Sequence, residues 1–268
     1  MEANLQRKRS SRFLIFSLIS ISFIVLGANF LGKNISTTTT DFLYLPVSST
    51  LLILSVIISV RFKGKSDIGR AYLFFTGFAA TWFIAELIWF NSEIFNQLNP
   101  YPYVDDYLYL LGYPFLLLFS IYYLKPVGAA ISKKMLAFAF LATVLFLVPT
   151  FYHTYSYNQN ANWVQIIWAG IYPLVDAILL FPAVIGMILF FKGNVGLLWS
   201  LMFLAILLNI IADSGFLYLD VDKTYYSGNP INLLYLWSYV LFSFGIYSHI
   251  KVFKKPKMKS FGDVDELK

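Results

Sequence analysis

Cysteine is absent from the 268 residues, and histidine occurs only at His153 and His249. The chain therefore has no disulfide, no reactive thiol and no cysteine-based zinc site, and we expect no metal centre. Charged residues are scarce as well, at 13% of the chain against about 25% in soluble domains. Hydrophobic residues make up 59%. These proportions indicate an integral membrane protein.

The sequence also lacks the short motifs that mark common enzymes: a P-loop, GxGxxG, HExxH or GxSxG. We place His153 in an outward connection and His249 near the inner face, which leaves no Ser-His-Asp set. No lysine or arginine lies deep in an apolar run, so a Schiff base has no candidate amine. Carboxylates alone can do acid–base chemistry, but no nucleophile accompanies them. We therefore expect no enzyme, no catalytic residue and no cofactor.

Long apolar runs dominate the chain. A helix needs about 20 mostly apolar residues to cross a bilayer. Eight runs meet this length approximately: 13–32, 43–60, 71–90, 107–124, 135–151, 163–190, 195–219 and 233–252. Their length and their lack of strict alternation favour helices over barrel strands. The predicted fold class is all-α integral membrane, with eight transmembrane helices.

The lysines and arginines are distributed unevenly between the two sides of these spans. The N-terminus, every second connection and the tail hold 18 of the 20, and only Lys33 and Lys223 lie on the other side. By the positive-inside rule, both termini are cytoplasmic in a multi-pass protein of the cell membrane. We expect the basic tail to contact anionic headgroups rather than nucleic acid. The outward connections are acidic or neutral. We assign Asp41 to the first of them, where Asn34 also begins a weak N-x-S glycosylation signal.

The second half of the chain repeats features of the first at a nearly constant separation. The separation is 127 residues at first and 126 after one deletion, for Pro46 with Pro173, Glu86 with Asp213, Tyr113 with Tyr239, and Lys125 with Lys251. Since each half holds four spans, the halves would be parallel repeats. The predicted organisation is a basic N-terminus (1–12), a first four-helix repeat (13–124), a second (125–252) and a cytoplasmic tail (253–268).

Acidic residues inside the predicted spans need an explanation, because a charge near the bilayer centre costs at least about 2.5 kcal/mol. Glu86 and Asp213 lie at the same depth in the outer part of their spans, and Asn209 is one turn from Asp213. Asp176 follows three residues after Pro173, a proline that we expect to kink its helix.

A shared outward-facing acidic pocket is the functional interpretation of these positions. Its candidate ligand-binding residues are Glu86, Asp105, Asp106, Asp176, Asn209 and Asp213. Structural alternatives stay open: helix N-capping for the Asp105–Asp106 pair, bonds across helices for Glu86 and Asp213, and a bond into the proline-disrupted backbone for Asp176. A pocket of this composition favours cations, protonated amines, or polar neutral and aromatic ligands.

Two segments carry a resemblance: IYPLVD at 171–176 and YPYVDDYLYLLGYP at 101–114. With eight spans and a later ADSGFLY…NLLYLWSY unit, they resemble the multi-pass membrane N-terminal sensory regions of microbial GGDEF, EAL and histidine-kinase signalling proteins. The resemblance covers about residues 10–252, and its matching positions are Pro173, Asp176, Asp106, Tyr113, Pro114 and Asp213. It implies a membrane-embedded sensory module. The short tail departs from that pattern, and we expect no output domain.

The function expected from these observations is a stand-alone sensory or ligand-binding module, with a separate cytoplasmic signalling partner. A small secondary transporter for a cation, proton or polar solute is the first alternative, because duplicated halves and a broken helix suit alternating access. The absence of matching inner gate residues argues against it. The second alternative is a non-catalytic accessory subunit whose polar residues only join helices.

Overall fold

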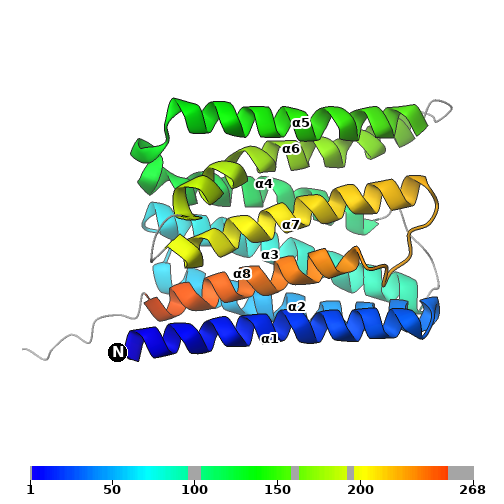
Figure 1. The fold of residues 1–268 in the computed structure, drawn as a ribbon, viewed down its shortest axis with the longest axis horizontal. Helices are drawn as coiled ribbons and strands as arrows, with labels where there is room; N and C mark the ends of the chain where they lie inside the picture. Colours follow the sequence, from blue (N-terminus) through cyan, green and yellow to red (C-terminus); the bar gives the residue numbers. More distant parts are fainter. Residues whose placement is uncertain (1, 96–103, 158–162, 192–195, 253–268) are drawn as a thin grey trace, which may run out of the picture.

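Helices make up nearly all of the described part of the chain. The computed structural model describes residues 2–95, 104–157, 163–191 and 196–252 (Figure 1). The long helices in these ranges are α1 (Glu2–Phe30), α2 (Lys33–Phe62), α3 (Asp67–Phe90), α4 (Val104–Leu124), α5 (Lys133–Tyr157), α6 (Trp163–Phe191), α7 (Gly196–Val221) and α8 (Asn232–Val252). A π-helical turn, η1 (Asn91–Phe95), extends α3, and a 3₁₀ segment, η2 (Lys125–Ala130), follows α4.

Eight helices within these described ranges are long and apolar enough to cross a membrane. This confirms the all-helical class and the number of apolar runs predicted from the sequence. It also indicates a multi-pass membrane protein, since each helix satisfies its own backbone in lipid. The helix α6 continues through Pro173 to Phe191, so the proline does not end it.

The start of α2 differs from the sequence prediction. The apolar run begins at residue 43, but the helix begins at Lys33, so Asp41 lies inside it and is buried. Our assignment of Asp41 to an outward connection is therefore wrong. Side chains of the polar first turns are bonded to the chain near residue 228, as Ser36 Oγ donates to the Gly228 carbonyl at 2.8 Å. Tertiary contacts of this kind override weak helix propensity. His153, also predicted in a connection, lies in α5.

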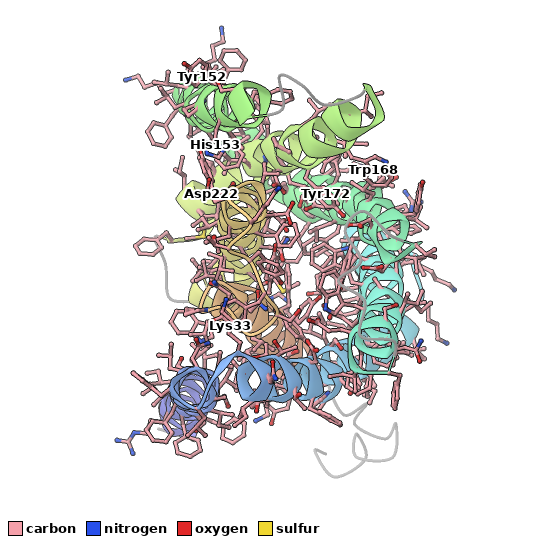
Figure 2. The ribbon with its side chains drawn as sticks, turned by 90° about the vertical axis from the view of Figure 1, so that its right-hand side faces the viewer. Lys33, Tyr152, His153, Trp168, Tyr172 and Asp222 are labelled. Carbon is pink, nitrogen blue, oxygen red and sulfur yellow. The ribbon has the colours of Figure 1, made fainter. Side chains whose placement is uncertain are left out.

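Six of the described helices form a closed ring. Following their contacts, α2 packs on α3, α3 on α4, α4 on α6, α6 on α7, α7 on α8, and α8 back on α2. Figure 2 looks along this ring from the end where Lys33 and Asp222 lie. The ring matters for function because side chains from helices far apart in sequence point into one shared interior.

The remaining two long helices of the described chain lie outside the ring. Helix α1 packs on α2 and α8, and α5 packs on α6 and α7. Figure 2 shows them at separate corners, with Tyr152 on the periphery of α5 and Tyr172 nearer the centre. Both peripheral helices expose large apolar side chains, such as Phe16 at 67% and Leu145 at 65%. Such surfaces suit contact with acyl chains.

An aromatic layer fills the middle of the ring. The Phe75 ring lies 5.0 Å from Phe119 and 5.1 Å from Phe242, centroid to centroid, and Phe78 lies 5.5 Å from Phe242. All four side chains are fully buried. Edge-to-face contacts of this kind stabilise aromatic clusters beyond simple burial. The layer divides the interior into two polar regions, one toward each end.

Candidate functional site

A hollow lies inside the ring, in the half opposite to the N-terminus. It offers about 100 Å³ of space that the centre of a water molecule can occupy. A buried water needs roughly 10–15 Å³ on this measure, so the hollow is large enough for several waters or one small ligand. The acidic residues in its wall are Asp41, Glu86, Asp106 and Asp213.

Tyrosine and tryptophan make up most of the remaining wall. None of the described residues that line the hollow is lysine, arginine or histidine. The acids come from α2, α3, α4 and α7, so the site depends on closure of the ring. A wall that combines several carboxylates with aromatic faces provides negative potential and surfaces on which a cation can rest.

Glu86 of α3 is buried and is held by tyrosine hydroxyls. Tyr239 of α8 donates its hydroxyl proton to Glu86 Oε1 at 2.6 Å. Tyr109 of α4 is a further hydrogen-bond partner of the same carboxylate. One turn along α3, Trp82 donates from Nε1 to the Tyr109 carbonyl at 2.9 Å. The Glu86 carboxylate therefore joins three helices at one point.

Asp213 of α7 is held in the same manner. Tyr113 of α4 donates to its Oδ2 at 2.7 Å, and Tyr235 of α8 donates to its Oδ1 at 2.7 Å. Asn209, one turn earlier on α7, adds a third donor to Oδ2 at 2.9 Å. The predicted pairing of Asn209 with Asp213 on one helix face is present in the structure.

The other predicted carboxylates divide between the wall of the hollow and the protein behind it. Asp106 lines the hollow and accepts a hydrogen bond from Tyr172 at 2.7 Å. Asp105 is fully buried but is not part of the wall, and neither of its oxygens accepts a hydrogen bond from another residue. Asp176 is also buried outside the wall, beside the carboxylate of Asp213. The structure therefore brings Glu86, Asp106 and Asp213 to the hollow, but not Asp105 or Asp176.

Asp41 is the acidic residue of the wall that sequence reasoning missed. It is 2% exposed, and no hydroxyl, amide or indole group donates to either carboxylate oxygen. Its acidic neighbours are Glu93 and Glu86, and the Glu93 carboxyl is within hydrogen-bonding reach of Asp41. A signal is present in the sequence: Ser36, Thr40, Asp41, Tyr44 and Ser48 follow helical spacing and form one buried face. Because the stretch is rich in serine and threonine, it resembles a connection unless the helical pattern is extended backward from the apolar run.

The connection between α7 and α8 covers one side of the hollow. Tyr225 and Ser227 of this segment line it. The segment is fastened to the α1–α2 corner, because Thr37 donates to the Ser227 carbonyl at 2.6 Å and Ser36 donates to the Gly228 carbonyl. Gly228 has a φ of 87° and its position against Ser36 leaves no room for a Cβ, so the turn requires glycine. Burial raises the pKa of the Tyr225 hydroxyl.

A second buried polar cluster lies beyond the aromatic layer, toward the end where the N-terminus lies. His249 of α8 bonds through Nδ1 with the Tyr72 hydroxyl, and its Nε2 lies 3.2 Å from the Tyr123 hydroxyl. Along α8, Phe242 separates His249 from Tyr239 at the hollow. The two polar regions are therefore divided by packed rings.

Comparisons with protein-family models, with curated proteins and with solved structures found no match. Among the described residues, no group of three or more histidine, aspartate or glutamate side chains is arranged to hold a metal ion. The function must therefore be inferred from the geometry of the hollow and of the residues around it.

Proposed function

We propose that this protein is a membrane-embedded sensory or ligand-binding module with an outward-facing acidic pocket. One observation carries the proposal: carboxylates from four helices of the ring converge on a single hollow lined by aromatic rings. Intramembrane carboxylates are expensive and mark functional sites more often than not. The resemblance to membrane sensory regions of signalling proteins agrees with this proposal and remains part of it.

The proposal includes an orientation and an internal duplication. Both termini are cytoplasmic, since the basic residues gather at that end, and the basic tail contacts anionic headgroups. The two halves are parallel repeats. The helix contacts support this, because α4 against α6 and α8 against α2 are equivalent contacts if the halves exchange places. The hydrogen bonds support it too, since Tyr113 reaches Asp213 while Tyr239 reaches Glu86.

Signal would pass inward through the ring. Occupation of the hollow changes the hydrogen bonds that tie α4 to α7 and α8 to α3. These helices run on to the cytoplasmic end, where Lys125 pairs with Asp67 at 3.0 Å and Arg61 donates to the Ile250 carbonyl at 2.6 Å. A cytoplasmic signalling partner would detect a shift of these helix ends.

A small secondary transporter is the second candidate, and one observation favours it. His249, Tyr72 and Tyr123 form a buried polar cluster on the inner side of the aromatic layer. The sequence alone disfavours transport, because no inner gate residues are evident in it. In a transporter, the solute would pass from the hollow to this cluster when the aromatic layer opens.

Ligand-dependent stabilisation tests the proposed pocket. Purified protein in lipid nanodiscs would be unfolded thermally, followed by circular dichroism, with small cations, amines, amino acids, sugars and aromatic acids in turn. A ligand at about 100 times its dissociation constant adds about 2.7 kcal/mol to the free energy of unfolding, so the midpoint temperature should rise by several degrees. Uptake of the same compounds into proteoliposomes would then be measured.

Two variants of α7 control this measurement. Leu217→Trp fills the hollow, because Leu217 is part of its wall, whereas Ile211→Trp places the same side chain on an exposed surface. The proposal expects stabilisation of the unmodified protein and of Ile211→Trp, but not of Leu217→Trp. Stabilisation without uptake supports a sensor, and stabilisation with uptake supports the transporter. If no compound of any class stabilises the protein, the pocket proposal fails and a purely structural subunit remains.

A further inference from the structure

The hydrogen bonds around the hollow distinguish its carboxylates from one another. Three of the four acidic residues in the described wall already accept hydroxyl donors: Glu86 from Tyr239, Asp213 from Tyr113 and Tyr235, and Asp106 from Tyr172. Their lone pairs are used to hold the tyrosine rings in place. These three groups therefore shape the hollow more than they offer free acceptors to a ligand.

Asp41 is different. Its side chain is part of the wall and is almost fully buried, yet neither oxygen receives a hydrogen bond from a hydroxyl, amide or indole donor. Among the described residues, the only group within reach of a hydrogen bond is another acid, Glu93, and a buried carboxylate that has no basic, hydroxyl, amide or indole donor is costly. The neighbouring carboxylates of Glu93 and Glu86 add negative charge, and no described lining residue is basic. The site lacks a positively charged group that donates hydrogen bonds.

We propose that the hollow binds a compact organic ammonium ion and that Asp41 is its counter-ion. This inference rests on the proposed ligand-binding function and adds the chemical class of the ligand. A primary ammonium group carries three N–H donors, so it supplies both the charge and the donors that Asp41 lacks.

Aromatic faces beside Asp41 favour an organic cation over an inorganic one. Tyr44 lies on the same face of α2 as Asp41, three residues later, and Trp89 and Trp82 of α3 line the same hollow. Cations bind over aromatic faces with an attraction that increases when the site is dry. A divalent metal ion prefers six or more oxygens instead, and the described acidic residues offer no such cluster.

The volume limits the ligand to a small one. A buried cavity of about 150 Å³ holds benzene, and the hollow measures about 100 Å³. The bound ion therefore has only a few non-hydrogen atoms, as in a short alkylammonium. Long polyamines and bulky quaternary ions do not fit.

Binding of n-propylammonium chloride to the full chain in nanodiscs tests the inference, with 1-propanol as the uncharged molecule of equal length and sodium chloride as the salt control. A change in the intensity or wavelength of tryptophan fluorescence reports binding, since two tryptophans line the hollow. We expect the ammonium to bind at least about tenfold more tightly than the alcohol. Asp41→Asn should abolish most of this preference, because hydrogen bonds to charged groups contribute about 1.5–3 kcal/mol, or roughly ten- to hundredfold in affinity.

Asp67→Asn is the matched control, because Asp67 is a carboxylate at the opposite end of the ring that pairs with Lys125. It should bind both probes like the unmodified protein. A second measurement needs no variant: tert-butylammonium and tert-butanol have nearly the same shape and size, and the cation alone should bind. This comparison still tests the inference if Asp41→Asn does not fold.

The failures of this experiment are distinguishable. If the ammonium and the alcohol bind equally, or if Asp41→Asn keeps the full preference for the ammonium, the inference is overturned while a pocket remains. If only a neutral or anionic compound of the wider panel stabilises the protein, the ligand class is wrong but the proposed function stands. Failure of every compound overturns both.

Discussion

Glu86 and Asp213 are the two carboxylates that the proposed repeat makes equivalent, and their surroundings are alike in one respect and different in another. Each carboxylate binds two tyrosine hydroxyls, one from α4 and one from α8. Asp213 receives a third donor from Asn209, whereas Trp82, at the corresponding position one turn from Glu86, donates to the Tyr109 carbonyl instead. The tyrosine hydrogen bonds, which both carboxylates have, join the two halves. The extra Asn209 donor leaves Asp213 with less free acceptor capacity toward the hollow than Glu86 has.

Two of the tyrosine hydrogen bonds cross from one half of the chain to the other. Tyr113 of the first half bonds Asp213 of the second, and Tyr239 of the second bonds Glu86 of the first, so each carboxylate receives one of its donors from the other half. An unsatisfied carboxylate or hydroxyl in lipid costs free energy. Each half therefore depends on the other to complete its hydrogen bonds, and the central hollow is a result of the closure of the helix ring.

Removing either carboxylate should give the largest effect. Glu86→Leu orphans two donors and Asp213→Leu orphans three. Each orphaned donor costs about 1 kcal/mol, so the free energy of unfolding should fall by about 2 kcal/mol for Glu86→Leu and about 3 kcal/mol for Asp213→Leu. Reversible unfolding in mixed detergent micelles measures both values.

The amide variants Glu86→Gln and Asp213→Asn are the controls for this pair. They keep an acceptor oxygen and a similar volume, so each should lose less stability than the leucine variant at the same position. Equal losses for the amide and leucine variants would mean that the tyrosine hydroxyls do not depend on these acceptors. A larger loss at Glu86 than at Asp213 would contradict the count of donors.

Packing next to the two carboxylates should differ as well. Gly112 of α4 lies against the Trp82 indole, where an added Cβ would overlap the indole nitrogen. That nitrogen is fixed by its bond to the Tyr109 carbonyl, so the ring has no easy way to move. Gly112→Ala should therefore cost about 2 kcal/mol of unfolding free energy, as overpacking does elsewhere. The same unfolding assay measures it.

Ser238 is the position 126 residues later, on α8, and it serves as the matched comparison. It already accommodates a Cβ, and its buried hydroxyl has no hydrogen-bond partner. Ser238→Ala should therefore not lower the unfolding free energy, because it removes a buried hydroxyl that makes no hydrogen bond. If Gly112→Ala is as harmless as Ser238→Ala, the α3–α4 contact is looser than the structure indicates.

The sequence predicted the parts of this protein that depend on local patterns. Apolar runs locate the helices, whereas the repeat that would pair Glu86 with Asp213 at a separation of 127 residues stays a prediction. Contacts between α4 and α6 and between α8 and α2 could not be predicted in this way, because they depend on how the ring closes. Asp41 was missed for a related reason: it lies in polar turns whose side chains Ser36 and Thr37 bond to a distant part of the chain. Which carboxylate lacks a hydrogen-bond donor depends on contacts between helices, and the local sequence pattern does not show these contacts.

Tyr113 and Tyr239, whose hydroxyls bond from one half to the other, allow the smallest change that tests the comparison of Glu86 with Asp213. Tyr113→Phe and Tyr239→Phe each remove one hydroxyl that joins the halves and leave the ring in place. Each should cost about 1 kcal/mol, since interhelical hydrogen bonds in membranes contribute up to about 1.7 kcal/mol. The double variant measures coupling. Independent bonds should add within about 0.5 kcal/mol.

Tyr107→Phe is the control for these substitutions, because Tyr107 lies on α4 but is 64% exposed. It should leave stability unchanged. A double variant that costs clearly less than the sum would mean that breaking one crossing already releases the other, so the halves separate as rigid units and the hollow opens in one step. Additive costs would mean that each carboxylate holds its own helices, and a ligand beside Asp41 could then loosen the α3 side without disturbing Asp213.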